Sequence, residues 1–207
     1  MNNHLKPLIA TLLLAGSASA FAASSVDLTV TGLITPSACE PTLSNGGTVD
    51  YGKISAKDLK PDQATSLPWQ SVQLTVTCDA ATLMALESKD NRGGSSYGGN
   101  TTEFGLGLIN SSEKLGDMEL RIVSPIADGV AARGIGSIDG GLTWFGDYYL
   151  ANNNLISVAD ASTVAPMPVK LFTSELSIRT RIAPTNQLTL NNEVAIDGSV
   201  TVTVRYL

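Results

Sequence analysis

The two ends of the chain carry short segments in which apolar and polar residues alternate. Upstream of the first cysteine, every second position is apolar or glycine: Val26, Leu28, Val30, Gly32 and Ile34. The last residues repeat the pattern, with one face formed by Val200, Val202, Val204 and Tyr206. A period of two predicts a strand with one buried face. Because a strand at a chain end can expose unpaired backbone groups, both segments invite pairing with another chain.

The interior of the chain predicts further short strands. Alternation favours strands over residues 48–54, 72–78, 118–122, 170–182 and 188–196. Residues 80–89 are rich in helix formers and allow a helical turn, but we expect a strand that leads into a turn at 90–92. Turn-forming residues recur at 137–144 and 184–186, and the glycine-rich stretch 93–102 is expected to be a flexible surface loop. Such closely spaced turns favour an all-β chain folded as a β-sandwich.

The first 22 residues have the layout of a secretory signal peptide. A weakly basic start with His4 and Lys6 precedes an apolar core at Leu8–Gly16, and small residues offer overlapping cleavage sites after Ala20 and Ala22. The apolar core is well short of the roughly 20 residues that span a bilayer, although an uncleaved membrane anchor is the alternative. We expect cleavage after Ala22 and export.

The charge balance excludes two classes of partner. The chain has 13 Lys and Arg residues against 19 Asp and Glu, for a net charge of −6, and its basic residues form no cluster. Nucleic acids and anionic membrane surfaces attract concentrated positive charge. We therefore expect no nucleic-acid partner.

The two cysteines, Cys39 and Cys78, are an even pair in a chain that we expect to be exported. A disulfide is the default for such a pair in an oxidising compartment. Closing a loop of this length would stabilise the fold by roughly 3–4 kcal/mol in the chain-entropy model. A metal site or a reactive thiol is a weaker alternative, because two sulfurs do not fill a zinc shell and the single histidine lies in the leader. We expect no metal and no cofactor.

An enzymatic function has little support in the sequence. No histidine follows the leader, so neither a Ser-His-Asp nor a Cys-His arrangement can form. The carboxylate pairs Asp117/Glu119 and Asp139/Asp147 could serve a glycosidase. Acidic residues near turns are more often solvated, so we expect that the protein is not an enzyme and has no catalytic residues.

Two non-enzymatic alternatives stay open. A transmembrane barrel also ends in an alternating strand with an aromatic residue, but aromatic girdles are scarce here and an early disulfide is atypical. A secreted carbohydrate-binding β-sandwich is the stronger alternative. The sugar rings of a bound carbohydrate could stack on the aromatic residues Trp69, Trp144, Phe145, Tyr148 and Tyr149.

The order of these parts is similar to that of a known family. An exported leader, an alternating segment with a glycine, two cysteines and an alternating last strand with a penultimate tyrosine resemble chaperone–usher fimbrial subunits, or pilins. Residues 39–52 (CEPTLSNGGTVDYG) and 74–78 (LTVTC) resemble one branch of that superfamily, long catalogued as a domain of unknown function. Pilins often carry a glycine about fourteen positions from the C-terminus. Val194 stands there in this chain and the nearest glycine is Gly198, which leaves the register of the last strand open.

The resemblance implies an all-β fold of a particular kind, an incomplete immunoglobulin-like β-sandwich completed by donor-strand exchange. It divides the chain into a signal peptide (1–22), an N-terminal donor-strand extension (23–38) and a pilin domain (39–207). The donor residues would be Val26, Leu28, Val30, Gly32 and Ile34, with Gly32 at the shallowest part of the acceptor groove. The acceptor groove and chaperone docking edge would be formed by Val200, Val202, Val204, Tyr206 and Leu207.

The resemblance also implies a function and partners. The chain would be a structural subunit of a surface fimbria that supports cell adhesion, after passage through the periplasm. Its partners would be a periplasmic chaperone, an outer-membrane usher and other fimbrial subunits. A minor adaptor or tip adhesin is an alternative role within the same fibre, although the chain has no room for a separate receptor domain.

Overall fold

The computed structural model describes residues 28–32 and 38–207. The expected leader and the expected donor residues Val26 and Ile34 lie outside the described residues. The chain divides into two units, residues 1–34 and 35–207. In the first unit, residues 28–32 belong to no strand, and the side chains of Leu28 and Val30 are almost fully exposed. Across the described ranges, no helix has the length and apolar character needed to cross a membrane.

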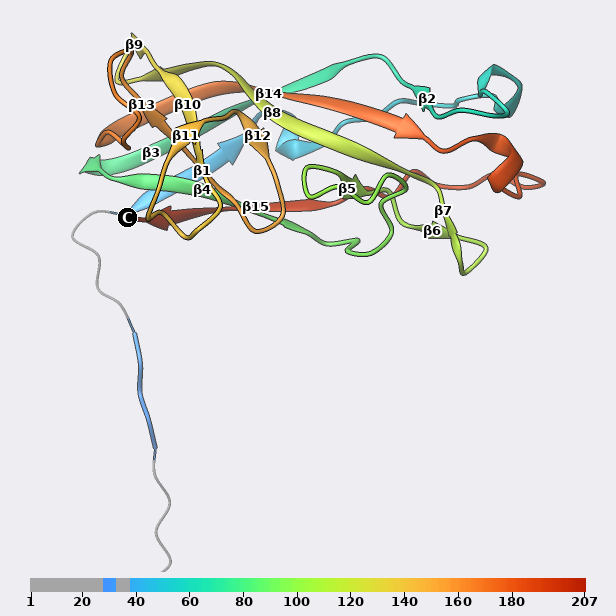
Figure 1. Cartoon of the computed structure of the whole chain (residues 1–207), viewed down its shortest axis with the longest axis horizontal. Helices are drawn as coiled ribbons and strands as arrows, with labels where there is room; N and C mark the ends of the chain where they lie inside the picture. The colour runs from blue at the N-terminus through green and yellow to red at the C-terminus, as the bar shows by residue number, and fades with distance from the viewer. Residues whose placement is uncertain (1–27, 33–37) are drawn as a thin grey trace, which may run out of the picture. The chain divides into compact units, whose positions relative to one another are not determined.

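The second unit is all-β, and its larger sheet has eight strands (Figure 1). The main path of this sheet runs β1-β3-β14-β8-β12, with β2 paired to β14 and with β5 and β9 paired to β8. Its strands are β1 (Cys39–Leu43), β2 (Thr65–Ser66), β3 (Gln70–Thr82), β5 (Phe104–Gly105), β8 (Gly116–Ala127), β9 (Val130–Ala131), β12 (Tyr149–Leu150) and β14 (Val169–Ile182). All of these ladders are antiparallel. The long strands β3, β14 and β8 therefore form the centre, and β1 lies at one edge.

The smaller sheet has five strands in the order β11-β10-β13-β4-β15, also antiparallel throughout. Its strands are β4 (Met84–Asp90), β10 (Arg133–Ser137), β11 (Phe145–Gly146), β13 (Leu155–Ala159) and β15 (Val200–Tyr206). A separate hairpin joins β6 (Leu108–Ile109) to β7 (Glu113–Lys114), and three 3-10 turns lie at η1 (Ser44–Gly47), η2 (Ala56–Asp58) and η3 (Thr185–Gln187). The chain passes from the larger sheet to the smaller one at Leu83, between β3 and β4.

The two sheets enclose a common core, as in a β-sandwich. Alternate residues of the central strands face it, which the burial pattern of β3 shows clearly: Val72, Leu74, Val76 and Cys78 are buried while the residues between them are not. The other sheet contributes buried side chains from β4 and β13, such as Leu86 and Ile156. A second, smaller core lies among Leu67, Leu106, Ile109, Leu115 and Ile182. The alternation in sequence thus reports the buried face of the strands correctly.

Most of the expected strands are confirmed. The stretches 72–78, 118–122, 170–182 and 200–206 lie in β3, β8, β14 and β15. Residues 80–89 are strand and not helix, since β3 ends and β4 begins there, and the turn expected at 90–92 follows directly. The turn expected near residue 140 also forms, between β10 and β11.

Two expected strands, at residues 48–54 and 188–196, are wrong. Neither range contains strand structure. Both ranges do direct their apolar residues inward, and Tyr51, Ile54, Leu190 and Val194 pack against the second core. Alternation therefore identified a buried face in each segment, but a strand also needs a neighbouring backbone, and these two segments have a cavity between them.

The glycine-rich stretch 93–102 is a loop, as expected, but it is not simply a surface loop. Ser95 and Ser96 are buried, and the Ser95 hydroxyl donates to the Arg92 carbonyl and accepts from the Gly107 backbone N–H. The Asp117 carboxylate accepts a hydrogen bond from the Gly98 N–H at 3.1 Å. These buried polar contacts anchor the loop to the end of the larger sheet.

Candidate functional site

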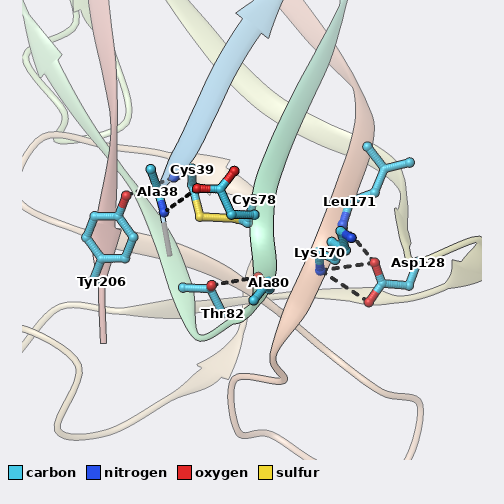
Figure 2. The surroundings of a disulfide bond; sticks show 10 residues. Ala38, Cys39, Cys78, Ala80, Thr82, Asp128, Lys170, Leu171 and Tyr206 are labelled. Atoms are coloured by element: carbon cyan, nitrogen blue, oxygen red, sulfur yellow. Dashed lines mark hydrogen bonds between the residues drawn. A yellow bond between two sulfur atoms is a disulfide. The ribbon is translucent and has the colours of Figure 1, made fainter. Parts of the chain in front are cut away.

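The expected disulfide between Cys39 and Cys78 is present and joins β1 to its neighbour β3 (Figure 2). The two cysteines stand directly opposite each other in the antiparallel ladder. Next to them, the Ala38 backbone N–H donates to the Asp79 carboxylate at 3.3 Å, and the Asp79 N–H donates to the Ala38 carbonyl at 3.0 Å. The first residue of the edge strand is therefore fastened covalently and by hydrogen bonds to a central strand.

The edge strands β1 and β15 come together at one corner of the second unit. In the described residues β15 pairs with β4 alone, and β1 pairs with β3 alone, so each strand has one edge free of a ladder. At the end of β15, the hydroxyl oxygen of Tyr206 accepts a hydrogen bond from the Cys39 backbone N–H at 2.9 Å. This contact links the start of β1 to the end of β15, as Figure 2 shows.

The side chains between these two edges are apolar and only partly buried. Val200, Val202 and Val204 of β15 pack against the main core without being enclosed by it. Cys39 and Leu43 of β1 do the same from the other sheet. We call these five residues the open seam, because core-facing side chains remain partly accessible here.

The open seam continues toward a cavity of about 680 Å³. One wall is residues 49–56, which follow β1, and the other is residues 190–196, which precede β15. The floor includes Leu115 and Ile182, which are both buried in the second core. The walls are thus the two segments that the alternation assigned wrongly to strands.

The wall at 190–196 is anchored by hydrogen bonds at both of its ends. The Thr189 backbone N–H donates to the Glu113 carboxylate at 2.6 Å, and the Asn110 side-chain amide donates to the Thr189 carbonyl at 2.9 Å. The hydrogen bond from the Thr189 N–H comes first, followed by one from the Asn110 side-chain amide to the same carboxylate, and together they hold the pKa of the Glu113 carboxyl below its usual range. At the other end of the wall, the Arg92 guanidinium donates two hydrogen bonds, of 2.8 and 2.6 Å, to the Asp197 carboxylate.

One ion pair crosses the cavity from wall to wall. The ammonium group of Lys53 lies 2.9 Å from a carboxylate oxygen of Glu193, and both residues line the cavity. Both side chains are highly exposed, so water and salt screen the pair and its strength is small. It is a weak link across the mouth of the cavity.

The residues expected to form the acceptor groove and docking edge are therefore neighbours on β15, with Leu207 directly after it. Tyr206 and Leu207 are both partly exposed, and the Leu207 N–H donates to the Leu83 carbonyl. Val194 lines the cavity, whereas Gly198 lies against Leu106 and Met118 so closely that a Cβ would stand 2.9 Å from Leu106. The role of β15 and Leu207 in binding another chain stays a prediction.

Of the donor residues, Leu28, Val30 and Gly32 are described. Among the described residues, nothing lies within 4 Å of the position that a Cβ would take on Gly32. That Gly32 is needed for close contact with another chain stays a prediction.

The carboxylate pairs considered for catalysis are engaged in other contacts. The buried Asp117 accepts from the Arg181 guanidinium at 2.7 Å, and Glu119 forms an ion pair with Arg179 across β8 and β14. Asp139 accepts hydrogen bonds within its own turn, and Asp147 accepts from the backbone N–H groups of the two tyrosines that follow it. Over residues 28–32 and 38–207, no group of three or more His, Cys, Asp or Glu residues could hold a metal ion.

The aromatic residues considered for sugar stacking do not all lie together. The Trp144 indole N–H donates to the Gly141 carbonyl within the turn before β11. Tyr148 and Tyr149 lie against each other, with ring centroids 5.2 Å apart. Trp69 directly precedes β3, so it lies on the opposite side of β8 from the two tyrosines. Its ring lies under the guanidinium of Arg121.

The fold and this site define a disulfide-linked β-sandwich whose edge strands β1 and β15 flank partly exposed core residues. Residues 28–123 match the model of a family described as "Protein of unknown function (DUF1120)". The matched stretch contains both cysteines and the strands β1, β3 and β4. This agrees with the resemblance to a domain of unknown function that residues 39–52 and 74–78 indicated.

Two proteins of Escherichia coli (strain K12) are similar in sequence. "Protein GltF" is 29% identical over 233 aligned positions, which cover 92% of each chain. "Uncharacterized protein YhcF" is 32% identical over 138 positions, which cover 55% of this chain and 58% of that protein. Neither name describes an activity.

Proposed function

We propose that this chain is a structural subunit of a chaperone–usher fimbria and that it polymerises by accepting and donating a strand. The observation that carries the proposal is the free edge of β15, which lies beside the partly exposed core residues of the open seam. The seam continues toward a cavity with a buried apolar floor. A strand laid along this edge would gain main-chain hydrogen bonds from β15 and cover the open seam.

The segment before Cys39 has the pattern that such a site requires. An added strand directs every second side chain into the groove, which matches the spacing of Val26, Leu28, Val30 and Ile34. Burying four apolar side chains of this size would contribute roughly 6–12 kcal/mol before the cost of ordering the segment. The extension of one copy would thus complete the sandwich of the next.

The two walls of the cavity support the same proposal. Residues 49–54 and 188–196 present apolar side chains to the second core but have no ladder partner among the described residues. A strand inserted between them would give both walls a neighbouring backbone. It would also fill the cavity and cover the partly exposed apolar wall residues Ile54, Leu190 and Val194.

The proposal includes a cellular route. The disulfide fits an oxidising compartment, so folding would take place in the periplasm beside a chaperone that covers β15 until a donor strand replaces it. An outer-membrane usher and further fimbrial subunits would be the other partners. The protein would act by assembly and adhesion and would carry out no chemical reaction.

A synthetic peptide spanning residues 23–37 tests the proposal. Purified acceptor protein should take up this peptide and form a stable complex, measured by native mass spectrometry and by a rise in melting temperature. Val202→Lys on the core-facing side of β15 should abolish uptake, whereas the matched change Thr203→Lys on the exposed side should not. No uptake by the wild-type protein, or equal uptake by both variants, would contradict strand acceptance at β15.

A further inference from the structure

The outer face of the larger sheet carries one arginine that differs from all the others. The chain has six arginines, all of them in described positions: Arg92, Arg121, Arg133, Arg179, Arg181 and Arg205. Five have a hydrogen bond or an ion pair to their guanidinium groups. In the described residues, Arg121 has no such partner, and its Nε is buried without a hydrogen bond.

The only interaction at the Arg121 guanidinium in the described structure is with an aromatic ring. Its Cζ lies 4.5 Å from the centroid of the Trp69 ring, and the Cζ of Arg179 lies 5.7 Å from the same ring. Arg179 also forms an ion pair with Glu119, which leaves Arg121 as the guanidinium with unused donors. The stacking on Trp69 fixes the position of Arg121 without consuming its N–H groups.

The register of the sheet places a second aromatic residue on the other side of Arg121. Tyr149 of β12 is directly opposite Arg121 of β8, so both side chains belong to the same face of the sheet. Next in the row stands Ser177 of β14, a small residue. Trp69 is about half exposed, at 48%, and Tyr149 is partly exposed and lies against the half-exposed ring of Tyr148. A guanidinium with free donors thus lies between accessible aromatic surfaces.

We propose that Arg121, with Trp69 and Tyr149 on either side, binds the carboxylate of a terminal sugar acid, such as a hexuronic acid. A guanidinium recognises a carboxylate through two parallel N–H···O bonds. The aromatic rings beside it suit the C–H faces of a pyranose ring and would select a sugar over a simple anion.

Two features favour a single sugar acid over an acidic segment of another protein. A peptide rich in Asp and Glu needs several cations, and the described part of this face offers one guanidinium without a hydrogen-bond or ion-pair partner. The chain also carries a net charge of −6, which repels a polyanion but tolerates one carboxylate. The site lies on the outer face of the larger sheet and does not depend on the proposed strand exchange, so either proposal can fail without the other.

The test is a titration of the disulfide-bonded protein with methyl glucuronide and with methyl glucoside, followed by calorimetry and by NMR. The glucuronide should bind, perturb the indole N–H signal of Trp69, and bind at least about tenfold more tightly than the uncharged glucoside, because hydrogen bonds to charged groups are strong. Arg121→Gln should lower the association constant by a similar factor. Arg121→Lys keeps the charge but loses the planar pair of donors. Its association constant for the glucuronide should lie between those of the wild type and Arg121→Gln.

The matched control is Arg205→Gln. Arg205 is an exposed arginine on the smaller sheet and is paired with Glu87, so its removal should leave glucuronide binding unchanged. Equal binding of both sugars, perturbations that exclude Trp69, or unchanged binding by Arg121→Gln would each overturn the proposal. Acetate as effective as the glucuronide would show plain anion binding, and a glutamate-rich peptide that binds more tightly would show a protein ligand; both results would overturn the sugar assignment. A melting curve for each variant separates lost binding from lost folding, and the NMR mapping on the wild-type protein stands even if a variant fails to fold.

Discussion

At the residue scale, single carboxylates organise the turns of this protein. Asp139 accepts from the Ser137 hydroxyl, the Leu142 N–H, and both the N–H and the hydroxyl of Thr143, at 2.6–3.1 Å. These contacts, first those from Thr143, hold the pKa of the Asp139 carboxyl well below its usual range. The turn between β10 and β11 therefore depends on an ionised aspartate.

This dependence predicts how stability changes with pH. Because the pKa of Asp139 is lower in the folded than in the unfolded chain, its ionised form stabilises the fold above an ordinary aspartate pKa of about 4, and the stabilisation is lost as the pH falls below it. Asp139→Asn should lower the melting temperature at neutral pH, and the difference from wild type should shrink in acid. A difference that stays constant from neutral pH to about pH 3 would contradict this account.

Gly32 gives a second prediction at the same scale. Strand propensity alone predicts that Gly32→Val is harmless or slightly favourable in an extended segment. If Gly32 enters a shallow part of another subunit's groove, the added side chain overpacks a preformed site, which costs roughly 1–3 kcal/mol. A peptide of residues 23–37 with Gly32→Val should therefore exchange into the acceptor more slowly than the native peptide. Thr31→Val, on the opposite face of the segment, is the matched control, and equal rates for all three peptides would exclude the proposed register.

At the element scale, the sequence predicts the buried faces better than it predicts the strands. Val72 to Cys78 and Val200 to Tyr206 alternate and are strands, whereas residues 188–196 alternate and are not. Alternation depends on which side chains meet the core, and strand structure depends also on a neighbouring backbone that lies far away in sequence. The disulfide could be predicted from the cysteine count and the compartment. The cavity and the Arg121–Trp69 contact could not, because each depends on how distant segments align.

The ion pair between the cavity walls gives a prediction at this scale. Since Lys53 and Glu193 link the two walls across the mouth of the cavity, a strand that enters must separate them or pass beneath them. Glu193→Gln should speed uptake of the 23–37 peptide by about two- to fivefold at low salt, in keeping with the small strength of an exposed pair. The gain should vanish in high salt, where the wild-type pair is screened.

The exchange of charges between the walls is the control. Lys53→Glu combined with Glu193→Lys restores an ion pair of the opposite orientation, so uptake should return to the wild-type rate. If the single variant and the charge exchange behave alike, the ion pair does not control entry. That result would leave strand acceptance at β15 itself intact.

At the scale of the whole molecule, the segment before Cys39 and the sandwich have separate tasks in the proposed function. Deleting residues 23–34 should leave a domain that folds, forms its disulfide and binds its chaperone, because the described core is built from residues after Cys39. The same protein should be unable to donate a strand. Size-exclusion chromatography of the chaperone complex and electron microscopy of cells expressing the truncated chain measure the two properties. Fibres assembled from the truncated protein would contradict donation by this segment, and failure to fold beside the chaperone would make it an ordinary internal strand.

The position of the disulfide has a mechanical consequence. In a fibre joined through the N-terminal extensions, any pulling force would enter each sandwich at Ala38. Cys39 is the first residue of β1 and is bonded to Cys78, so the load would pass straight into β3 and would bypass the five-residue ladder of the edge strand. β3 in turn is held along most of its length by β14 in the middle of the sheet. The disulfide would thus transmit the tension from the extension to β3. A reduced subunit stretched in a force spectrometer should unfold at a lower force, beginning with the detachment of β1.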